Sequence, residues 1–247
     1  MNVKLLAHTQ INRKLKSWKG LTIDLDNGNS VHITDGQAVA LTAIRTCYSA
    51  NKPSEIIAKE GEKYFGRMAT DGKGGSDADR LFRHIVNSGH TSTLEHLTFT
   101  FAIEGVSRAL LAQLTRHRVG FSFSVQSQRF VRFGSDDKTG GFDYVVPDSI
   151  RKNIGANSLF HDFMEEIQEK YDTLRELGIP PEDARMVLPN AAATNLVMTA
   201  NLRALLDFYS KRRKGRGAQW EIAELAEKLR EAVVAVEPWA DVFFEQA

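Results

Sequence analysis

The clearest pattern in the chain is an alternation of large apolar residues with threonine or alanine over positions 97–103. The apolar members are Leu97, Phe99, Phe101 and Ile103. A period of two places neighbouring side chains on opposite faces of a sheet, so we predict a half-buried strand that Gly105 terminates. Shorter patterns predict further strands at Val3–His8, Leu21–Leu25, Ser30–Thr34 and Tyr144–Val146, and a strand or extended segment at Ala191–Ala200.

One predicted turn and two predicted glycine-rich loops separate these elements. Asp26-Asn27-Gly28-Asn29 has the composition of a hairpin turn, so the second and third predicted strands should pair. The stretches Thr70–Asp77 and Gly134–Gly141 combine glycine with aspartate, which is typical of loops. Asp77 or Asp79 is expected to cap the helix that follows the first loop.

Apolar residues spaced three and four positions apart predict helices over most of the remaining chain. The expected helices cover Gln37–Cys47, the region of Leu81–Val86 up to Gly89, Ser107–His117, about Asn157 to Gly178, Leu202–Tyr209 and Ile222–Val236. Strands come mainly first and helices mainly later, which indicates an α+β fold. No linker divides the sequence, so we predict one domain over residues 1–247.

The amino-acid composition disfavours several classes of protein. The 247 residues are 42% hydrophobic and 26% charged, with 32 Lys plus Arg against 31 Asp plus Glu. This near balance disfavours a dedicated duplex-binding protein, so cationic sites should be local and serve a small anion. No apolar run is long enough to cross a bilayer, and no secretion signal is evident. Cys47 is the single cysteine, which excludes a disulfide framework and favours a reducing cytosol.

The densest polar cluster begins with Arg116-His117-Arg118 and continues to Arg129, with serines at 122, 124 and 127. Arginine offers a planar fork to phosphate oxygens and serine adds hydroxyl donors, so the cluster could surround a phosphate and a flat heterocycle. A basic turn on a solvated surface is the alternative. Apolar residues between the polar ones favour a packed segment over that alternative: Val119, Phe121, Phe123, Val125, Phe130 and Val131. If the helix reaches His117, Gln113 and Arg116 share one of its faces.

Two further polar segments leave more than one interpretation open. Gly89–His96 contains two histidines and a glutamate, but it lacks the spacing of a zinc-binding helix, and a capped turn before the strand explains it equally. We therefore predict no metal. Lys211–Arg216 is a basic run that suits a nucleic-acid patch, the negative end of a helix dipole, or the wall of an anion pocket.

Five segments in this order resemble the flavin-dependent thymidylate synthase (ThyX-type) family. The signature is Arg116-His117-Arg118, eight residues, then Ser127-Gln128-Arg129. The other four are Arg45-Thr46-Cys47-Tyr48, Gly89-His90-Thr91-Ser92 with Glu95-His96, Ala184–Pro189, and Ala218–Ile222. The resemblance spans nearly the whole chain. It implies a central, mainly antiparallel sheet with flanking helices, in a single-domain subunit of a cytoplasmic homotetramer whose subunits share active sites.

The family likeness also implies a reaction and its ligands. The reaction is the reductive methylation of dUMP to dTMP, with methylenetetrahydrofolate as carbon donor and with FAD and NADPH or NADH as reductant. FAD would contact Ser92, Glu95, Arg116, His117, Arg118, Asn201, Arg203 and Asp207. dUMP would be held by His90, Gln113, Arg116, Ser127, Gln128, Arg129 and Arg185. Arg212 or Arg213 would stabilise the pyrimidine ring when its N3 proton is lost.

The residue inventory agrees with a flavin route. Cys47 lies outside the ligand segments, and a flavin-mediated reaction needs no protein nucleophile. Three positions depart from the family pattern. They are Val125, where Glu or Gln is common, Asp207, where Asn is expected, and Gly217, where His often stands.

Two other functions compete with this assignment. A nucleotide- or RNA-binding module would use Arg116, Arg118 and the basic run on phosphates, but it would also expose aromatic residues for base stacking. A flavoprotein reductase would bind FAD without responding to dUMP, and the chain lacks the Gly-x-Gly-x-x-Gly segment of Rossmann-type reductases. We predict small-molecule substrates, with no nucleic-acid and no membrane partner.

Overall fold

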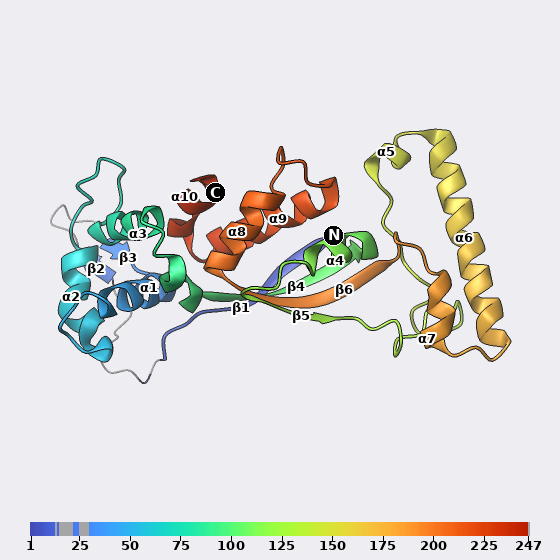
Figure 1. The fold of residues 1–247 in the computed structure, drawn as a ribbon, viewed down its shortest axis with the longest axis horizontal. Helices are drawn as coiled ribbons and strands as arrows, with labels where there is room; N and C mark the ends of the chain where they lie inside the picture. The colour runs from blue at the N-terminus through green and yellow to red at the C-terminus, as the bar shows by residue number, and fades with distance from the viewer. Residues whose placement is uncertain (13, 15–21, 25–29, 247) are drawn as a thin grey trace. The chain divides into compact units, whose positions relative to one another are not determined.

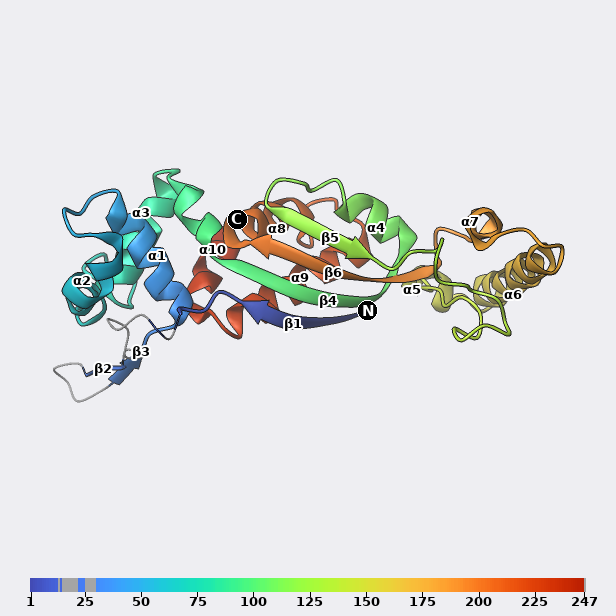
Figure 2. The same ribbon diagram turned by 90° about the horizontal axis from the view of Figure 1, so that it is seen from below.

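The alternating segment forms the strand β4 (Thr98–Ser107) of a four-stranded sheet in the computed structural model (Figure 1). The sheet order is β1-β4-β6-β5, with β1 at Asn2–His8, β5 at Phe121–Val125 and β6 at Ala193–Asn201. Figure 2 shows the four strands side by side. The structure describes residues 1–12, 14, 22–24 and 30–246.

The predicted burial of β4 is confirmed, whereas its predicted end is wrong. Phe99, Phe101 and Ile103 are buried on one face, as a period of two requires. The strand continues through Gly105 to Ser107. Gly105 adopts a φ of +67°, and its N–H donates to the Asn195 side chain at 3.0 Å, so the glycine bends the strand without terminating it.

Hydrogen bonds between neighbouring strands establish the antiparallel pairing that we predicted. The Gln126 N–H donates to the Asn195 carbonyl at 2.9 Å, and the Asn201 N–H donates to the Gly120 carbonyl at 3.2 Å. Residue numbers therefore rise along β5 as they fall along β6. Strand β6 confirms the extended segment that we predicted over 191–200.

A second, two-stranded sheet pairs β2 (Thr22–Asp24) with β3 (Ser30–His32), with Thr22 opposite His32. These antiparallel strands confirm the predicted pairing of two short strands. The turn predicted at 26–29 lies outside the described residues. The strand predicted at Tyr144–Val146 is wrong, because the structure has only an isolated bridge between Tyr144 and Ala192 there.

The chain forms two compact units. The first comprises Met1–Lys4, Ala102–Arg118 and Phe123–Met198, and the second comprises Leu5–Phe101, Val119–Ser122 and Thr199–Ala247. The sheet contributes strand residues to both units. The expectation of one domain over residues 1–247 stays a prediction.

The helices of the first unit are mostly short. They are α4 (Arg108–Leu114), α5 (Asp148–Arg151), α6 (Ile154–Glu176), α7 (Pro181–Ala184) and η3 (Arg185–Val187). Their core gathers Phe133, Phe142, Met164, Tyr171, Ala184 and Ala192. Tyr171 is fully buried, and its hydroxyl accepts the Phe133 N–H at 3.3 Å, so the phenol group is satisfied as burial requires. The predicted helix over 157–178 is confirmed, with its start at Ile154.

The second unit contains the remaining helices. They are α1 (Asp35–Thr46), η1 (Pro53–Glu55), α2 (Ile56–Phe65), α3 (Asp77–Asn87), η2 (Thr91–His96), α8 (Leu202–Arg212), α9 (Trp220–Val234), η4 (Pro238–Ala240) and α10 (Asp241–Gln246). Thr34 and Gln37 form a capping box at the start of α1. None of the helices in the described part of the chain is long and apolar enough to cross a membrane.

Two helix ends differ from the prediction. The N-cap of α3 is Ser76, not Asp77 or Asp79, because the Ser76 hydroxyl accepts the Asp79 N–H while the Asp79 carboxylate accepts the Ser76 N–H. Helix α4 ends at Leu114, with Thr115 as its C-cap. Arg116 therefore follows the helix, and the helical face that it was expected to share with Gln113 does not form.

Candidate active site

Two of the three predicted dUMP arginines of the first unit, Arg129 and Arg185, contact one residue of α7. The Arg129 guanidinium forms an ion pair with the Glu182 carboxylate, and Arg185 Nε donates to the Glu182 backbone carbonyl at 3.0 Å. Ser127 precedes Arg129 in a turn, where its hydroxyl accepts the Arg129 N–H at 3.2 Å. Two cations and one hydroxyl of the predicted substrate set are thus held by local bonds, as a phosphate site requires.

Arg108 belongs to the same surroundings, although the sequence did not single it out. Its Nη2 donates to the Gln126 carbonyl at 3.4 Å, whereas its buried Nε has no hydrogen-bond acceptor among the described residues. Burial, followed by the nearby positive charge of Arg185, lowers the pKa of Arg108. Arg108 is thus a partly buried cation close to a second cation, Arg185, and its Nε–H is an unused hydrogen-bond donor. Such an arrangement favours binding of an anion.

A signal for Arg108 was present in the sequence. The residue follows Ser107, whose hydroxyl caps α4 by accepting the Leu110 N–H at 3.0 Å. An arginine in the first turn faces the positive end of the helix dipole, which is unfavourable unless an anion is bound there. Recognition of the serine cap would therefore have marked Arg108 as unusual.

The signature segment is more exposed than its composition suggests. Val119 and Phe130 are 91% and 79% exposed, so the packing that we inferred from these apolar residues is wrong for both. Arg116 and Arg118 are exposed, and the His117 N–H donates to the Leu114 carbonyl at 3.0 Å. Gln113 and Gln128 are half-buried. An exposed cationic turn is open to a ligand or to another chain.

Four of the predicted FAD residues line one cleft in the second unit. Its volume is ≈340 Å³, and its walls are Glu95, Val119, Gly120, Asn201, Arg203, Ala204 and Asp207. The size falls within the range of small-molecule sites. Arg203 pairs with Glu95 across the cleft, and Asp207 pairs with Lys211 at 2.7 Å. The lining thus offers both donors and acceptors to a polar ligand.

Gly120 shapes the wall of this cleft. Its φ is +76°, and a Cβ built there would lie 2.7 Å from Ala204 Cβ and 2.8 Å from Asn201 Nδ2. Asn201 in turn caps α8, because its side-chain oxygen accepts the Ala204 N–H at 2.9 Å. Only glycine fits here without displacing the cap. The close backbone approach and the donors of Asn201 and Arg203 fit the polar part of a dinucleotide such as FAD.

The remaining predicted residues of the second unit lie outside the lining of that cleft. Ser92 is exposed in η2. His90 Nδ1 lies 3.1 Å from the Tyr48 hydroxyl, and the two rings meet edge to face. Within the described residues, no group of three histidine, cysteine or acidic side chains is placed to hold a metal.

The two candidate activating arginines lie at the end of α8. Arg212 is the last residue of the helix and Arg213 is its C-cap. Both side chains are half-buried. Gly215 and Gly217 follow with φ of +87° and +73°. Gly217 stands where a histidine is common in the family, and its backbone conformation is one that a histidine would rarely adopt.

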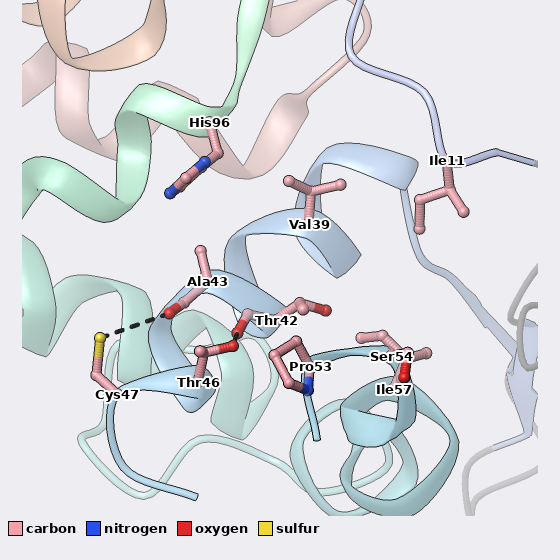
Figure 3. A pocket seen from close by; sticks show the side chains of 10 residues that line it. All are labelled: Ile11, Val39, Thr42, Ala43, Thr46, Cys47, Pro53, Ser54, Ile57 and His96. Atoms are coloured by element: carbon pink, nitrogen blue, oxygen red, sulfur yellow. Dashed lines mark hydrogen bonds between the residues drawn. The ribbon is translucent and has the colours of Figure 1, made fainter. Parts of the chain in front are cut away.

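A different cavity of ≈480 Å³ in the second unit has apolar walls (Figure 3). It is lined by Ile11, Val39, Thr42, Ala43, Thr46, Cys47, Pro53, Ser54, Ile57 and His96. The Thr42 and Thr46 hydroxyls donate to carbonyls of their own helix at 2.8 and 2.7 Å, so their methyl groups contribute to the wall. None of these lining residues is an arginine or lysine, which makes the cavity unsuitable for a phosphate.

Comparison with protein families identifies the group to which the chain is related. The family described as thymidylate synthase complementing protein matches residues 31–239. The flavin-dependent thymidylate synthase of Geobacter sulfurreducens is 39% identical over 207 residues, which cover 84% of this chain and 81% of that protein. The enzyme of the same name from Nitratidesulfovibrio vulgaris is 40% identical over 204 residues, covering 79% and 77% of the two chains.

Solved structures agree with the sequence comparison. The flavin dependent thymidylate synthase ThyX from Helicobacter pylori, complexed with FAD and dUMP, superposes with a TM-score of 0.64 at 25% identity. The match covers 100% of this chain and 99% of that one. The UMP/dUMP methylase PolB from Streptomyces cacaoi, at 22% identity and a TM-score of 0.69, shares the fold over 99% and 94% of the chains. The chain therefore belongs to the flavin-dependent thymidylate synthase family.

Proposed function

We propose that this chain methylates dUMP to dTMP, with methylenetetrahydrofolate as carbon donor and with FAD and NADPH or NADH as reductant. Family membership supports the reaction, and the H. pylori relative is a complex with FAD and dUMP. The structural observation that carries the proposal is the cleft in which Glu95, Asn201, Arg203 and Asp207 gather beside Gly120. Those four residues were expected at FAD from the resemblance alone.

The first unit supplies the nucleotide-binding groups. Arg129 and Arg185 would bind the phosphate of dUMP, with Ser127, Gln128 and Gln113 as further polar ligands. Arg108 joins this set because its Nε hydrogen has no acceptor within the described structure and Arg185 lies nearby. Bidentate guanidinium contacts to phosphate are charge-assisted and are therefore among the stronger polar interactions.

The second unit supplies the cofactor cleft and the activating cations. Asn201 and Arg203 would donate to FAD, whereas Glu95 and Asp207 would accept from its hydroxyl or amino groups. Ser92, Arg116, His117 and Arg118 complete the proposed FAD set, and His90 together with Arg116 completes the proposed dUMP set. FAD, when bound, supplies the hydride and methylene chemistry. Arg212 or Arg213 would stabilise negative charge on the pyrimidine, which makes a cysteine nucleophile unnecessary.

We also infer that the active form is a cytoplasmic homotetramer with shared active sites. Helix α6 supports an assembly, because Ile154, Leu159 and Phe163 are exposed along it. Exposed apolar residues of this size commonly mark contact with another chain. Light scattering on the purified chain tests the assembly, and a monomer at working concentration would contradict it.

The function is tested by the flavin absorbance of protein incubated with FAD and then desalted. We expect a retained flavin band that changes when dUMP is added. The Arg129→Ala variant should retain the band yet need a much higher dUMP concentration for the change, because it lacks a phosphate contact. A protein that retains no flavin, or a flavin that ignores dUMP in the wild type, would contradict the proposal.

A further inference from the structure

Glu182 contacts two of the proposed phosphate arginines at once. Its carboxylate forms an ion pair with Arg129, and its backbone carbonyl accepts Arg185 Nε at 3.0 Å. The residue lies in the first turn of α7, directly after Pro180 and Pro181, which fix the chain direction there. Glu182 was not among the residues that the sequence indicated for either ligand.

The ion pair with Arg129 is of a kind that a ligand can replace. The Arg129 and Glu182 side chains are 59% and 42% exposed. Pairs at such exposure contribute roughly 0–1 kcal/mol, because water competes for both partners. The Arg185 contact uses the Glu182 backbone and would persist if the carboxylate moved away.

The charge balance around Arg129 favours such an exchange. Arg108 and Arg185 form no ion pair within the described structure, and burial together with the charge of Arg185 lowers the pKa of Arg108. Among the described residues, Glu182 is the one whose carboxylate forms an ion pair with an arginine of this cluster of three. A phosphate and a carboxylate present similar oxygen pairs to a guanidinium fork, so the two compete for Arg129.

We propose that Glu182 is an internal counter-ion of the nucleotide site, which the phosphate of the nucleotide displaces from Arg129. This inference rests on the proposed binding of dUMP by the first unit. The carboxylate keeps Arg129 paired in the free protein, and after the exchange it repels the bound phosphate. Glu182 thereby lowers the affinity for 5′-monophosphates, substrate and product alike, and leaves the affinity for an uncharged nucleoside unchanged.

The test compares Glu182→Gln with a matched control, Asp183→Asn. Both variants remove one negative charge from α7, but Asp183 is exposed and forms no ion pair in the described structure. The FAD-loaded protein is titrated calorimetrically with dUMP, dTMP and deoxyuridine at low and high salt. Glu182→Gln keeps the size and shape of a side chain that is 42% exposed, so we expect it to fold as the wild type does, and Glu182→Ala provides a second variant.

We expect Glu182→Gln to bind dUMP and dTMP roughly threefold to tenfold more tightly than Asp183→Asn at low salt. The gain should shrink at high salt, and deoxyuridine binding should match the wild type. Equal dUMP affinity in the two variants would overturn the inference. Weaker dUMP binding in Glu182→Gln would also overturn it, because Glu182 would then orient Arg129 for the ligand. Wild-type protein that binds no dUMP would instead refute the proposed function.

Discussion

Replacement of Gly120 by alanine tests whether the cleft depends on a close backbone approach. The φ of Gly120 is +76°, a conformation that costs an alanine roughly 1–2 kcal/mol. The added Cβ would also lie 2.7 Å from Ala204 Cβ and 2.8 Å from Asn201 Nδ2. Loss of the Asn201 cap on α8 costs about 1 kcal/mol more. We expect Gly120→Ala to lower the free energy of unfolding by about 2–3 kcal/mol.

Gly72→Ala separates backbone strain from the clash. Gly72 has a φ of +73°, but a Cβ built there meets no atom within 4 Å. Urea unfolding should therefore show only the cost of the backbone conformation, roughly 1–2 kcal/mol, for Gly72→Ala, and a loss about 1 kcal/mol larger for Gly120→Ala. Because Gly120 and Asn201 line the cleft, FAD affinity should fall about tenfold, or 1.4 kcal/mol, in Gly120→Ala only. Equal urea midpoints and unchanged FAD affinity in both variants would refute the argument from the cleft wall.

Three further variants probe charges that the structure buries. Burial opposes ionisation of Glu60, but hydrogen bonds from Ser49, Asn51 and Arg45 outweigh it and lower the pKa to about 2. The ionised Glu60 carboxylate stabilises the fold by up to about 3 kcal/mol at pH values above its ordinary pKa of 4.5, and this stabilisation is lost as the pH falls toward 2. The urea midpoint of Glu60→Gln should therefore lie below that of the wild type near pH 7, and the two midpoints should converge in acid. Burial raises the pKa of Glu237 despite the hydrogen bonds from Thr34 and Trp239. Protonated Glu237 therefore adds to the free energy of unfolding below pH 4.5, and this addition is lost as the pH rises through the raised pKa. Glu237→Gln cannot ionise, so it should become more stable than the wild type as the pH rises through that value. Arg108→Met should bind dUMP at least about tenfold more weakly in calorimetry without losing stability, because it removes a phosphate donor and also a poorly paired buried cation.

Local patterns predicted the main elements because each depends on neighbouring residues in the sequence. The alternation around Phe99 and Phe101 was sufficient to place β4, and helical spacing was sufficient to place α6. Exact ends were predicted less well, since they depend on caps and long-range pairing. Gly105 remains in its strand because Asn195, ninety positions away, accepts its N–H. Ser76 caps α3 in place of Asp77 because Asp79 completes a reciprocal bond with it.

The candidate site was predicted through family motifs more than through periodicity. The family resemblance assigned Glu95, Asn201, Arg203 and Asp207 to one ligand, and these residues line one cleft although Glu95 is far from the other three in the chain. Arg108 and Glu182 were missed because the family resemblance implied no role for either residue. Their significance depends on burial and on partners that only the folded chain brings together. The exposure of Val119 and Phe130 was missed for a related reason, since apolar residues are not buried by composition alone.

The central claim is that this chain forms dTMP from dUMP by a flavin-dependent route. The most direct test is chromatographic measurement of dTMP after anaerobic incubation of the purified protein with dUMP, FAD, methylenetetrahydrofolate and a reduced nicotinamide, with NADPH and NADH in parallel samples. We predict that dTMP accumulates in the complete mixture. When the protein has first been freed of bound flavin, omission of any one of the four compounds should abolish dTMP formation. Formation of dTMP without FAD, or its absence from protein that retains FAD and binds dUMP, would contradict the claim.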